Sequence, residues 1–182
     1  MLEMLVYDDL QKNAAKILHP SQHGFIKGHS TQDNLRYVAT QIKNNLKNGY
    51  LFFIDLKSAF DLVPRNLVYQ QLKALNILSD TQIDILKFIH DNMHIQLGKS
   101  SCMTTVGTAQ GMLTPPMLFN IVFDGLIRIL ADSNTLTSEY ADDLVSLQES
   151  INGVIATINR IEKWINETHM QINKKIRHSM PR

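Results

Sequence analysis

The run Tyr-Leu-Phe-Phe-Ile-Asp-Leu at residues 50–56 limits the choice of fold more than any other stretch of the chain. It is continuously apolar and aromatic up to Asp55, which is typical of a strand that is buried on both faces. An ionised aspartate at the end of a buried strand is costly unless it is paired, hydrogen-bonded or bound to a metal ion. The sequence therefore predicts a buried strand that ends in a carboxylate in need of a partner.

A second strand signal surrounds the motif Tyr-Ala-Asp-Asp at residues 140–143. The flanking runs at residues 136–139 and 144–147 alternate in a way that predicts a β-hairpin with two adjacent carboxylates at its tip. Asp-Asp is a poor tight turn, and the two like charges repel unless a cation lies nearby. Hard divalent cations such as Mg2+ bind carboxylate oxygens together with waters and substrate phosphates. An isolated Asp-Asp is more often a solvated acidic turn, so the metal interpretation depends on the rest of the chain.

The remaining pattern predicts helices separated by short strands. The second of these helices starts at a capping box formed by Ser30 and Asp33, and has Leu35, Val38, Ala39 and Ile42 as its inner stripe. A second capping box pairs Ser79 with Gln82. Helices are expected over residues 2–18, 31–48, 66–75, 79–91, 116–130 and 151–168, and further strands over residues 93–97 and 102–106.

Composition sets only broad limits. A chain of 182 residues with 44% hydrophobic content fits one globular domain. Eighteen Lys and Arg against 17 Asp and Glu give a net charge of +1, which neither demands nor excludes a polyanionic partner. The single cysteine, Cys102, excludes an internal disulfide framework and a Cys-rich zinc site. No apolar run has the length of a membrane span, and the compartment stays open between nucleus, cytoplasm and organelle.

The loop at residues 21–31 contains two glycines together with His23, Lys27 and His29. Glycine allows backbone amides to come close to an anion, so a loop of this composition is suited to phosphate binding. An ordinary surface loop explains the same residues.

Several stretches, in this order, resemble the reverse transcriptases of non-LTR retrotransposons and, less closely, those of mobile group II introns. The resemblance runs from residue 22 to residue 173. Residues 22–31 are similar to the second fingers motif, residues 54–61, 109–120 and 140–143 to the first three palm motifs, and Trp164 with residues 170–173 to the start of the fourth.

The resemblance implies an α+β fold, in which a polymerase palm consists of a small antiparallel sheet backed by helices. Residues 1–49 would be partial fingers and residues 50–182 the palm, with no thumb. Asp55, Asp142 and Asp143 would hold two Mg2+ ions, or Mn2+, for nucleotidyl transfer. The implied activity is that of an RNA-directed DNA polymerase, whose partners are an RNA template, a DNA or RNA primer and dNTPs. Other protein chains would supply the thumb or a scaffold.

The resemblance also assigns roles outside the carboxylates. Phe60 would be the steric gate that excludes the 2′-hydroxyl of ribonucleotides, although a core aromatic is the ordinary fate of a phenylalanine. Gln110 and Gly111 would shape the floor of the nucleotide pocket, or else form a loop at the entry of a helix. Lys27 would contact the triphosphate or the template. Lys175, or else Lys174, would be an off-register candidate to protonate the pyrophosphate.

The departures from the family pattern leave two functional hypotheses open. Arginine is usual in the family where Ile26 and His29 stand here, a small hydroxyl residue where Met112 stands, and lysine where Ile176 stands. The metal site is thus retained while the grip on the triphosphate is weakened. The first hypothesis is an active polymerase. The second is a degenerate reverse-transcriptase-like domain that serves as a structural or RNA-binding subunit of a larger assembly, for example in an organelle. An expressed pseudogene fragment without function is a third reading.

Overall fold

The structure, a computed structural model, describes residues 2–45, 49–108, 111–131, 136–173 and 178–179. The chain forms two compact units, one from Met1–Leu18 with Ser58–Val122 and the other from His19–Lys57 with Phe123–Arg182. Each unit thus combines segments that are far apart in the sequence. The predicted division into fingers and palm near residue 49 is based on function and not on compactness, and it stays a prediction.

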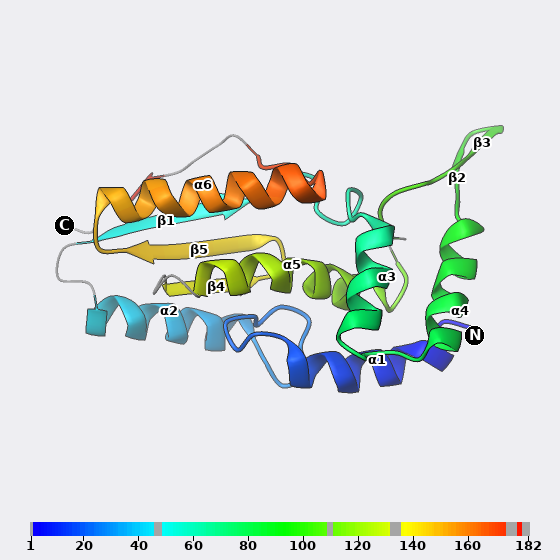
Figure 1. Cartoon of the computed structure of the whole chain (residues 1–182), viewed down its shortest axis with the longest axis horizontal. Coiled ribbons are helices and arrows are strands. Elements are labelled where there is room, and N and C mark those ends of the chain that lie inside the picture. Colours follow the sequence, from blue (N-terminus) through cyan, green and yellow to red (C-terminus); the bar gives the residue numbers. More distant parts are fainter. Residues whose placement is uncertain (1, 46–48, 109–110, 132–135, 174–177, 180–182) are drawn as a thin grey trace. The chain divides into compact units, whose positions relative to one another are not determined.

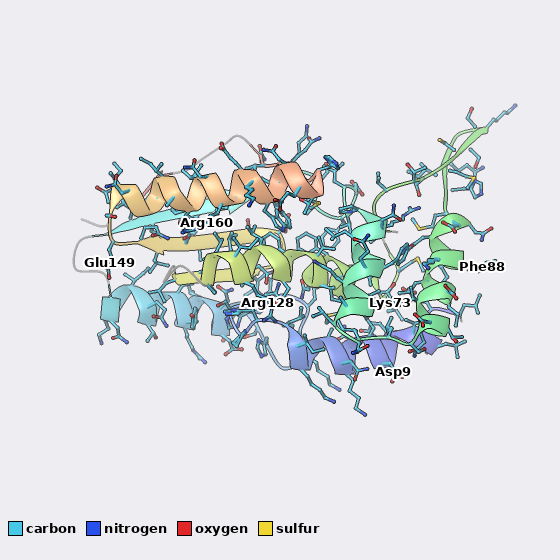
Figure 2. The ribbon with its side chains drawn as sticks, in the orientation of Figure 1. Asp9, Lys73, Phe88, Arg128, Glu149 and Arg160 are labelled. Carbon is cyan, nitrogen blue, oxygen red and sulfur yellow. The ribbon has the colours of Figure 1, made fainter. Side chains whose placement is uncertain are left out.

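The first unit consists of helices and one β-hairpin. Its elements are α1 (Met4–Ile17), α3 (Arg65–Ala74), α4 (Asp80–Asp91), β2 (His94–Leu97), β3 (Ser100–Met103) and the first half of α5 (Pro115–Ala131). Each helix buries an apolar stripe in the core of the unit, with Val6 and Leu10 on α1, Val68 and Leu72 on α3, and Ile83 and Leu86 on α4. Phe88, on α4, is 60% exposed and points away from this core (Figure 2).

The predicted start of α4 is confirmed in atomic detail. The Ser79 hydroxyl oxygen accepts a hydrogen bond from the Gln82 backbone N–H at 3.3 Å, and the Gln82 side-chain oxygen accepts one from the Ser79 N–H at 3.0 Å. This reciprocal pair satisfies N–H groups that have no partner within the helix.

The hairpin β2–β3, which extends from the C-terminal end of α4 (Figure 1), differs from the prediction in its second strand. That strand covers Ser100–Met103, and the predicted position at residues 102–106 is wrong. Gly98 has a φ of 59° and, with Lys99, forms a two-residue turn in which Leu97 pairs with Ser100. Because a left-handed glycine permits so tight a turn, the second strand begins earlier than the pattern suggested.

Arg65 joins the start of α3 to the segment that follows the hairpin. Its side chain is buried, with 6% exposure for the residue. The guanidinium donates to the carbonyl oxygens of Gly107 at 2.7 Å, Thr104 at 2.6 Å, His90 at 3.1 Å and Val106 at 3.2 Å. It also donates to the Thr104 hydroxyl at 2.6 Å. A buried guanidinium is tolerated here because carbonyl oxygens occupy its donors.

The second unit is an antiparallel sheet with helices against it. The described strands form the order β4 (Leu136–Tyr140), β5 (Asp143–Gln148), β1 (Tyr50–Asp55) and β6 (His178–Ser179). Helix α6 (Ile151–Thr168) runs along β1 and β5 (Figure 1), and the Gln148 side chain donates to the Thr157 hydroxyl of α6 at 3.0 Å. The ring of Phe123 on α5 meets Trp164 edge-on, with centroids 5.9 Å apart. The predicted α+β class is therefore correct.

Both strand predictions around the carboxylates are confirmed, with one exception in burial. The run at residues 50–55 is a strand, and residues 136–140 and 143–148 form the predicted hairpin. The prediction that β1 is buried on both faces is wrong at Phe53, which is 47% exposed while Phe52 and Ile54 are buried. Alternate residues of a strand point to opposite faces, so the face that carries Phe53 is only partly covered.

Helix α2 (Thr31–Asn45) has its predicted capping box, since the Asp33 carboxylate accepts from the Ser30 N–H at 3.0 Å. Its predicted inner stripe is partly wrong, because Leu35 is 69% exposed and Ala39 is exposed as well. The helix runs alongside β4 (Figure 1), and the Asn34 amide donates to the Glu139 carbonyl at 2.8 Å. A polar contact with a strand backbone thus replaces part of the apolar contact that the periodicity suggested. None of the helices within the described ranges is long and apolar enough to cross a membrane.

Replacing Arg65 by methionine is expected to destabilise the chain by about 3 kcal/mol, because several buried carbonyl oxygens lose a charged donor at once. The measurement is urea unfolding of the wild type and the variant. Arg36→Met is the matched control, because the Arg36 side chain is 77% exposed and its nearest carboxylate oxygen, on Asp33, is 3.8 Å away. The control is expected to change stability by less than about 0.5 kcal/mol. Equal effects of the two substitutions would contradict the role of the buried network.

Candidate active site

The pairing of β1 with β5 brings two of the predicted carboxylates together. Asp55 ends β1, Asp143 begins β5, and the two are direct partners in the antiparallel register. Opposite residues on neighbouring strands have Cβ atoms about 4.5–5.5 Å apart and point to the same face. Asp142 precedes Asp143 in the turn, next to Ala141, whose φ of 60° is left-handed. Tyr140 completes the row as the partner of Asp143 on β4.

The electrostatics of this row are unfavourable without a cation. Partial burial raises the pKa of Asp143, and the neighbouring carboxylates of Asp142 and then Asp55 raise it further. Like charges that lie opposite each other on adjacent strands destabilise a sheet. A bound cation would remove this repulsion.

The residues present fit a hard divalent cation in kind, because carboxylate oxygens are the ligands that Mg2+ prefers. Within the described ranges, however, no three Asp, Glu, His or Cys side chains converge on one point as a complete ligand set would. Asp55, Asp142 and Asp143 are close to one another in the fold without forming such a set. Their role as metal ligands stays a prediction.

The loop at residues 21–24 lies directly against the turn that carries the carboxylates. Its backbone continues the sheet beyond β4, because the Glu139 N–H donates to the Ser21 carbonyl at 3.0 Å and the His23 N–H donates to the Glu139 carbonyl at 3.1 Å. A Cβ atom added at Gly24 would lie 2.3 Å from the Ala141 backbone nitrogen. Glycine is thus required at residue 24 by the close approach of two backbones.

The loop side chains that were candidates for phosphate binding behave differently from one another. His23 is buried, with 8% exposure, and its ring lies 5.2 Å from that of His29 and 5.6 Å from that of Tyr37. Burial and the nearby His29 lower the pKa of His23, so it is not a cation presented to solvent. Lys27 and His29 are exposed. Binding of an anion by Lys27 stays a prediction.

Phe60 and Gly111, two of the residues predicted to contact the substrate, belong to the first unit. Phe60 is half-buried, its ring lies 5.1 Å from that of Phe119, and its carbonyl accepts from the Thr108 N–H at 3.0 Å. Gly111 is exposed and has a φ of 88°, a conformation that strains any residue with a side chain. Gln110 and Lys175 lie outside the described residues. The roles of all four stay predictions.

Glu139, which the sequence reasoning missed, is a fully buried acid next to the turn. It has 0% exposure, and within the part of the chain that the structure describes neither carboxylate oxygen has a hydrogen-bond partner. Burial raises its pKa from an ordinary value of 4.5 to about 9, and the charges of Asp142 and Asp124 add to this effect. The Ala141 N–H acts in the opposite direction but falls short of hydrogen-bonding geometry. The alternation around residues 136–139 carried no signal for this burial, because it places Glu139 with Thr137 on the face opposite Leu136, whereas Thr137, Ser138 and Glu139 are all buried in the structure.

Asn173 is a second residue that sequence reasoning did not assign to the site. Its side-chain amide donates to the Asp55 carboxylate at 2.9 Å, and its backbone N–H donates to the Asp55 carbonyl at 2.8 Å. It lies in the stretch at residues 170–173 that resembles the start of the fourth palm motif, but nothing in its residue type pointed to Asp55.

A family model described as reverse transcriptase (RNA-dependent DNA polymerase) matches residues 1–180. The chain therefore belongs to the reverse transcriptase family. Enzymes of this family generally use divalent metal ions.

Curated relatives narrow the comparison to non-LTR retrotransposons. The chain is 25% identical over 179 residues to the retrovirus-related Pol polyprotein from the type-1 retrotransposable element R2 of Nasonia vitripennis. It is 25% identical over 170 residues to that from the type-2 element R2DM of Drosophila melanogaster. The two matches cover 90% and 85% of this chain but 18% and 16% of those polyproteins. The chain thus spans less than a fifth of the length of these relatives.

Solved structures of telomerases share the fold. The telomerase of Candida albicans in complex with a fragment of telomeric RNA matches with a TM-score of 0.67 and 13% identity, over 98% of this chain and 35% of that one. The corresponding complex of Candida tropicalis matches with a TM-score of 0.71 and 11% identity, over 97% of this chain and 33% of that one. These likenesses concern the fold alone.

Replacing Glu139 by glutamine is expected to remove a pH dependence of stability. The pKa of Glu139 is higher in the folded chain than in the unfolded chain, so the folded chain binds the extra proton between pH 4.5 and about 9. Wild-type stability therefore falls as pH rises through this window, by at most about 1.4 kcal/mol per pH unit. The glutamine variant lacks this loss and is expected to be the more stable protein at pH 8, with little difference at pH 4.5.

The measurement is thermal unfolding of both proteins across this pH range. Glu149→Gln is the control, because Glu149 is exposed just beyond the end of β5 (Figure 2). A stability difference between wild type and Glu139→Gln that does not change with pH would contradict the assignment.

Proposed function

We propose that the chain is the part of an RNA-directed DNA polymerase that carries its metal-binding carboxylates. In this proposal it extends a DNA or RNA primer on an RNA template with dNTPs. The observation that carries the proposal is the pairing of Asp55 with Asp143, next to Asp142, in a chain of the reverse transcriptase family. Asp55 and Asp143 lie opposite each other at the ends of adjacent strands, and Asp142 is next to Asp143 in the turn. The repulsion between these like charges is one that binding of cations would offset.

Asp55, Asp142 and Asp143 would hold two Mg2+ ions, or Mn2+. The chemistry that such ions supply when bound is a lower pKa for the primer 3′-hydroxyl and neutralisation of charge on the leaving pyrophosphate. In the reaction the hydroxyl oxygen forms a bond to the α-phosphorus while the bond from that phosphorus to the pyrophosphate oxygen breaks.

The other residues of the chain would bind and select the substrate. Phe60 would exclude the 2′-hydroxyl of a ribonucleotide, and Gly111 with Gln110 would form the floor of the nucleotide pocket. Lys27 is exposed on the loop that packs against the turn, which suits a contact with phosphates. Lys175 would donate a proton to the pyrophosphate. Partners that supply a thumb or a scaffold in other chains belong to the same proposal.

A second candidate is a structural or RNA-binding subunit of a larger assembly. It is favoured by one observation, that among the described residues no three acidic or metal-ligating side chains converge on one point. The missing arginines at Ile26 and His29 agree with it.

Replacing Asp142 by asparagine is expected to reduce Mg2+-dependent incorporation of dNTPs on a primed RNA template by about 100-fold or more. The reason is that several kcal/mol of transition-state stabilisation depends on the bound ions. Asp55→Asn is expected to act similarly. Asp84→Asn is the matched control, because Asp84 lies on α4 with a side chain that is 72% exposed.

Direct binding of Mn2+, followed by electron paramagnetic resonance, completes the test and does not depend on turnover. Binding that is lost in Asp142→Asn and kept in Asp84→Asn supports the polymerase. If the wild type neither binds Mn2+ nor incorporates dNTPs, yet binds RNA, the second candidate replaces the first.

Replacing Phe60 by valine is expected to lower the preference for dNTPs over rNTPs by about 10-fold or more, since a smaller side chain leaves room for the 2′-hydroxyl. The measurement is the ratio of kcat/KM for matched deoxy and ribo substrates. Phe88→Val serves as the control, because Phe88 is an exposed phenylalanine. If Phe60 is only a core aromatic, its replacement lowers the Tm and leaves the ratio unchanged.

A further inference from the structure

Asp55 is held by a short segment that follows α6. The Asn173 side-chain amide donates to Asp55 Oδ2 at 2.9 Å, and the Asn173 backbone N–H donates to the Asp55 carbonyl at 2.8 Å. The two contacts tie both the main chain and the carboxylate of Asp55 to the same residue. These two hydrogen bonds restrict rotation of the Asp55 carboxylate.

The contact lies next to a short antiparallel bridge. Leu56 forms an antiparallel bridge with Ile172, and the Lys57 N–H donates to the Gln171 carbonyl at 2.8 Å. Residues 171–173 therefore run alongside the end of β1 and continue its hydrogen bonding where Asp55 leaves the sheet.

The end of α6 determines where this segment lies. His169, with a left-handed φ of 58°, follows the last residue of the helix and reverses the chain. Met170 is then buried, with 2% exposure. The buried ring of Trp164 packs on Phe123, and the Trp164 backbone carbonyl accepts a hydrogen bond from the Thr168 hydroxyl at 2.8 Å. The packing of α6 thus places Asn173 beside Asp55.

The chemistry of an amide suits this position. A neutral N–H donor stabilises one carboxylate oxygen and brings no positive charge that would compete with a cation. The carboxylate keeps its other oxygen, Oδ1, for a metal ion. Carboxylates that ligate metals are generally oriented by such outer hydrogen bonds, and removing one typically costs about 10–100-fold in metal affinity.

We propose that Asn173 is a positioning residue, which orients the Asp55 carboxylate for binding of the divalent cation and which α6 holds in place. This inference rests on the proposed function, because it assigns Asn173 to the same metal site.

The test compares Mn2+ affinity, measured by electron paramagnetic resonance, in wild type, Asn173→Leu and Asn173→Ala. Leucine keeps the branched shape of asparagine and removes its polar groups, including the donor to Asp55, whereas alanine removes the branched end of the side chain as well. Each variant keeps the backbone N–H that bonds to the Asp55 carbonyl. Both are expected to weaken Mn2+ binding by about 10-fold, near the lower end of the range because Asn173 is exposed to solvent.

Asn166→Ala is the matched control. Asn166 and Asn173 both line a cavity of about 710 Å³ between α6, β1 and residues 170–173. Within the described structure the side-chain hydrogen bond to the Asp55 carboxylate comes from Asn173 and not from Asn166. The control is expected to bind Mn2+ as the wild type does. A second readout is the NMR signal of the Asn173 side-chain amide, which is expected to shift in Asp55→Ala and to stay in place in Asp84→Asn.

The outcomes separate the two proposals. A wild type that binds Mn2+ and variants at residue 173 that bind it equally well would overturn the positioning role alone. A loss in Asn173→Ala without a loss in Asn173→Leu would also overturn it, because packing and not the donor would then matter. A wild type that binds no Mn2+ would overturn the proposed function and the positioning role together.

Discussion

The antiparallel register between β1 and β5 is the constraint on which the candidate site depends. A shift of one residue in this pairing would move Asp55 to the opposite face of the sheet from Asp143. The register is held by the apolar residues that the same strands bury, such as Ile54 and Leu144, and by the polar contact of Gln148 with α6. The packing of the core therefore also determines where the carboxylates lie.

Two buried polar groups, one in each unit, are accommodated in different ways. Arg65 is buried with its donors occupied by carbonyl oxygens, so it acts as a rigid link inside the first unit. Glu139 is buried without such partners among the described residues, and its neutral form is favoured. The hydrogen-bonded arrangement of Arg65 stabilises the fold. Glu139, by contrast, is a buried acid without hydrogen bonds to its carboxylate among the described residues, and it lies three residues before Asp142.

Most of the secondary structure follows from local patterns in the sequence. The capping boxes at Ser30 and Ser79 and the hairpin around residues 140–143 depend on neighbours in the chain, and they were predicted correctly. The wrong predictions at Phe53 and Leu35 concern burial, which depends on tertiary packing. The exposure of Phe53 and Leu35 depends on what lies over each face, and periodicity carries no information about that. The contact of Asn173 with Asp55 joins residues 118 positions apart, which only the folded chain brings together.

The contact between Gly24 and Ala141 has a consequence for sequence variation. The loop and the turn approach so closely that a side chain at residue 24 would push against the backbone that leads into Asp142. A larger residue at this position is tolerable only if the turn itself changes its conformation. Among related sequences that keep this turn, residue 24 is thus expected to stay glycine, although it lies more than 100 positions away from the turn in the sequence.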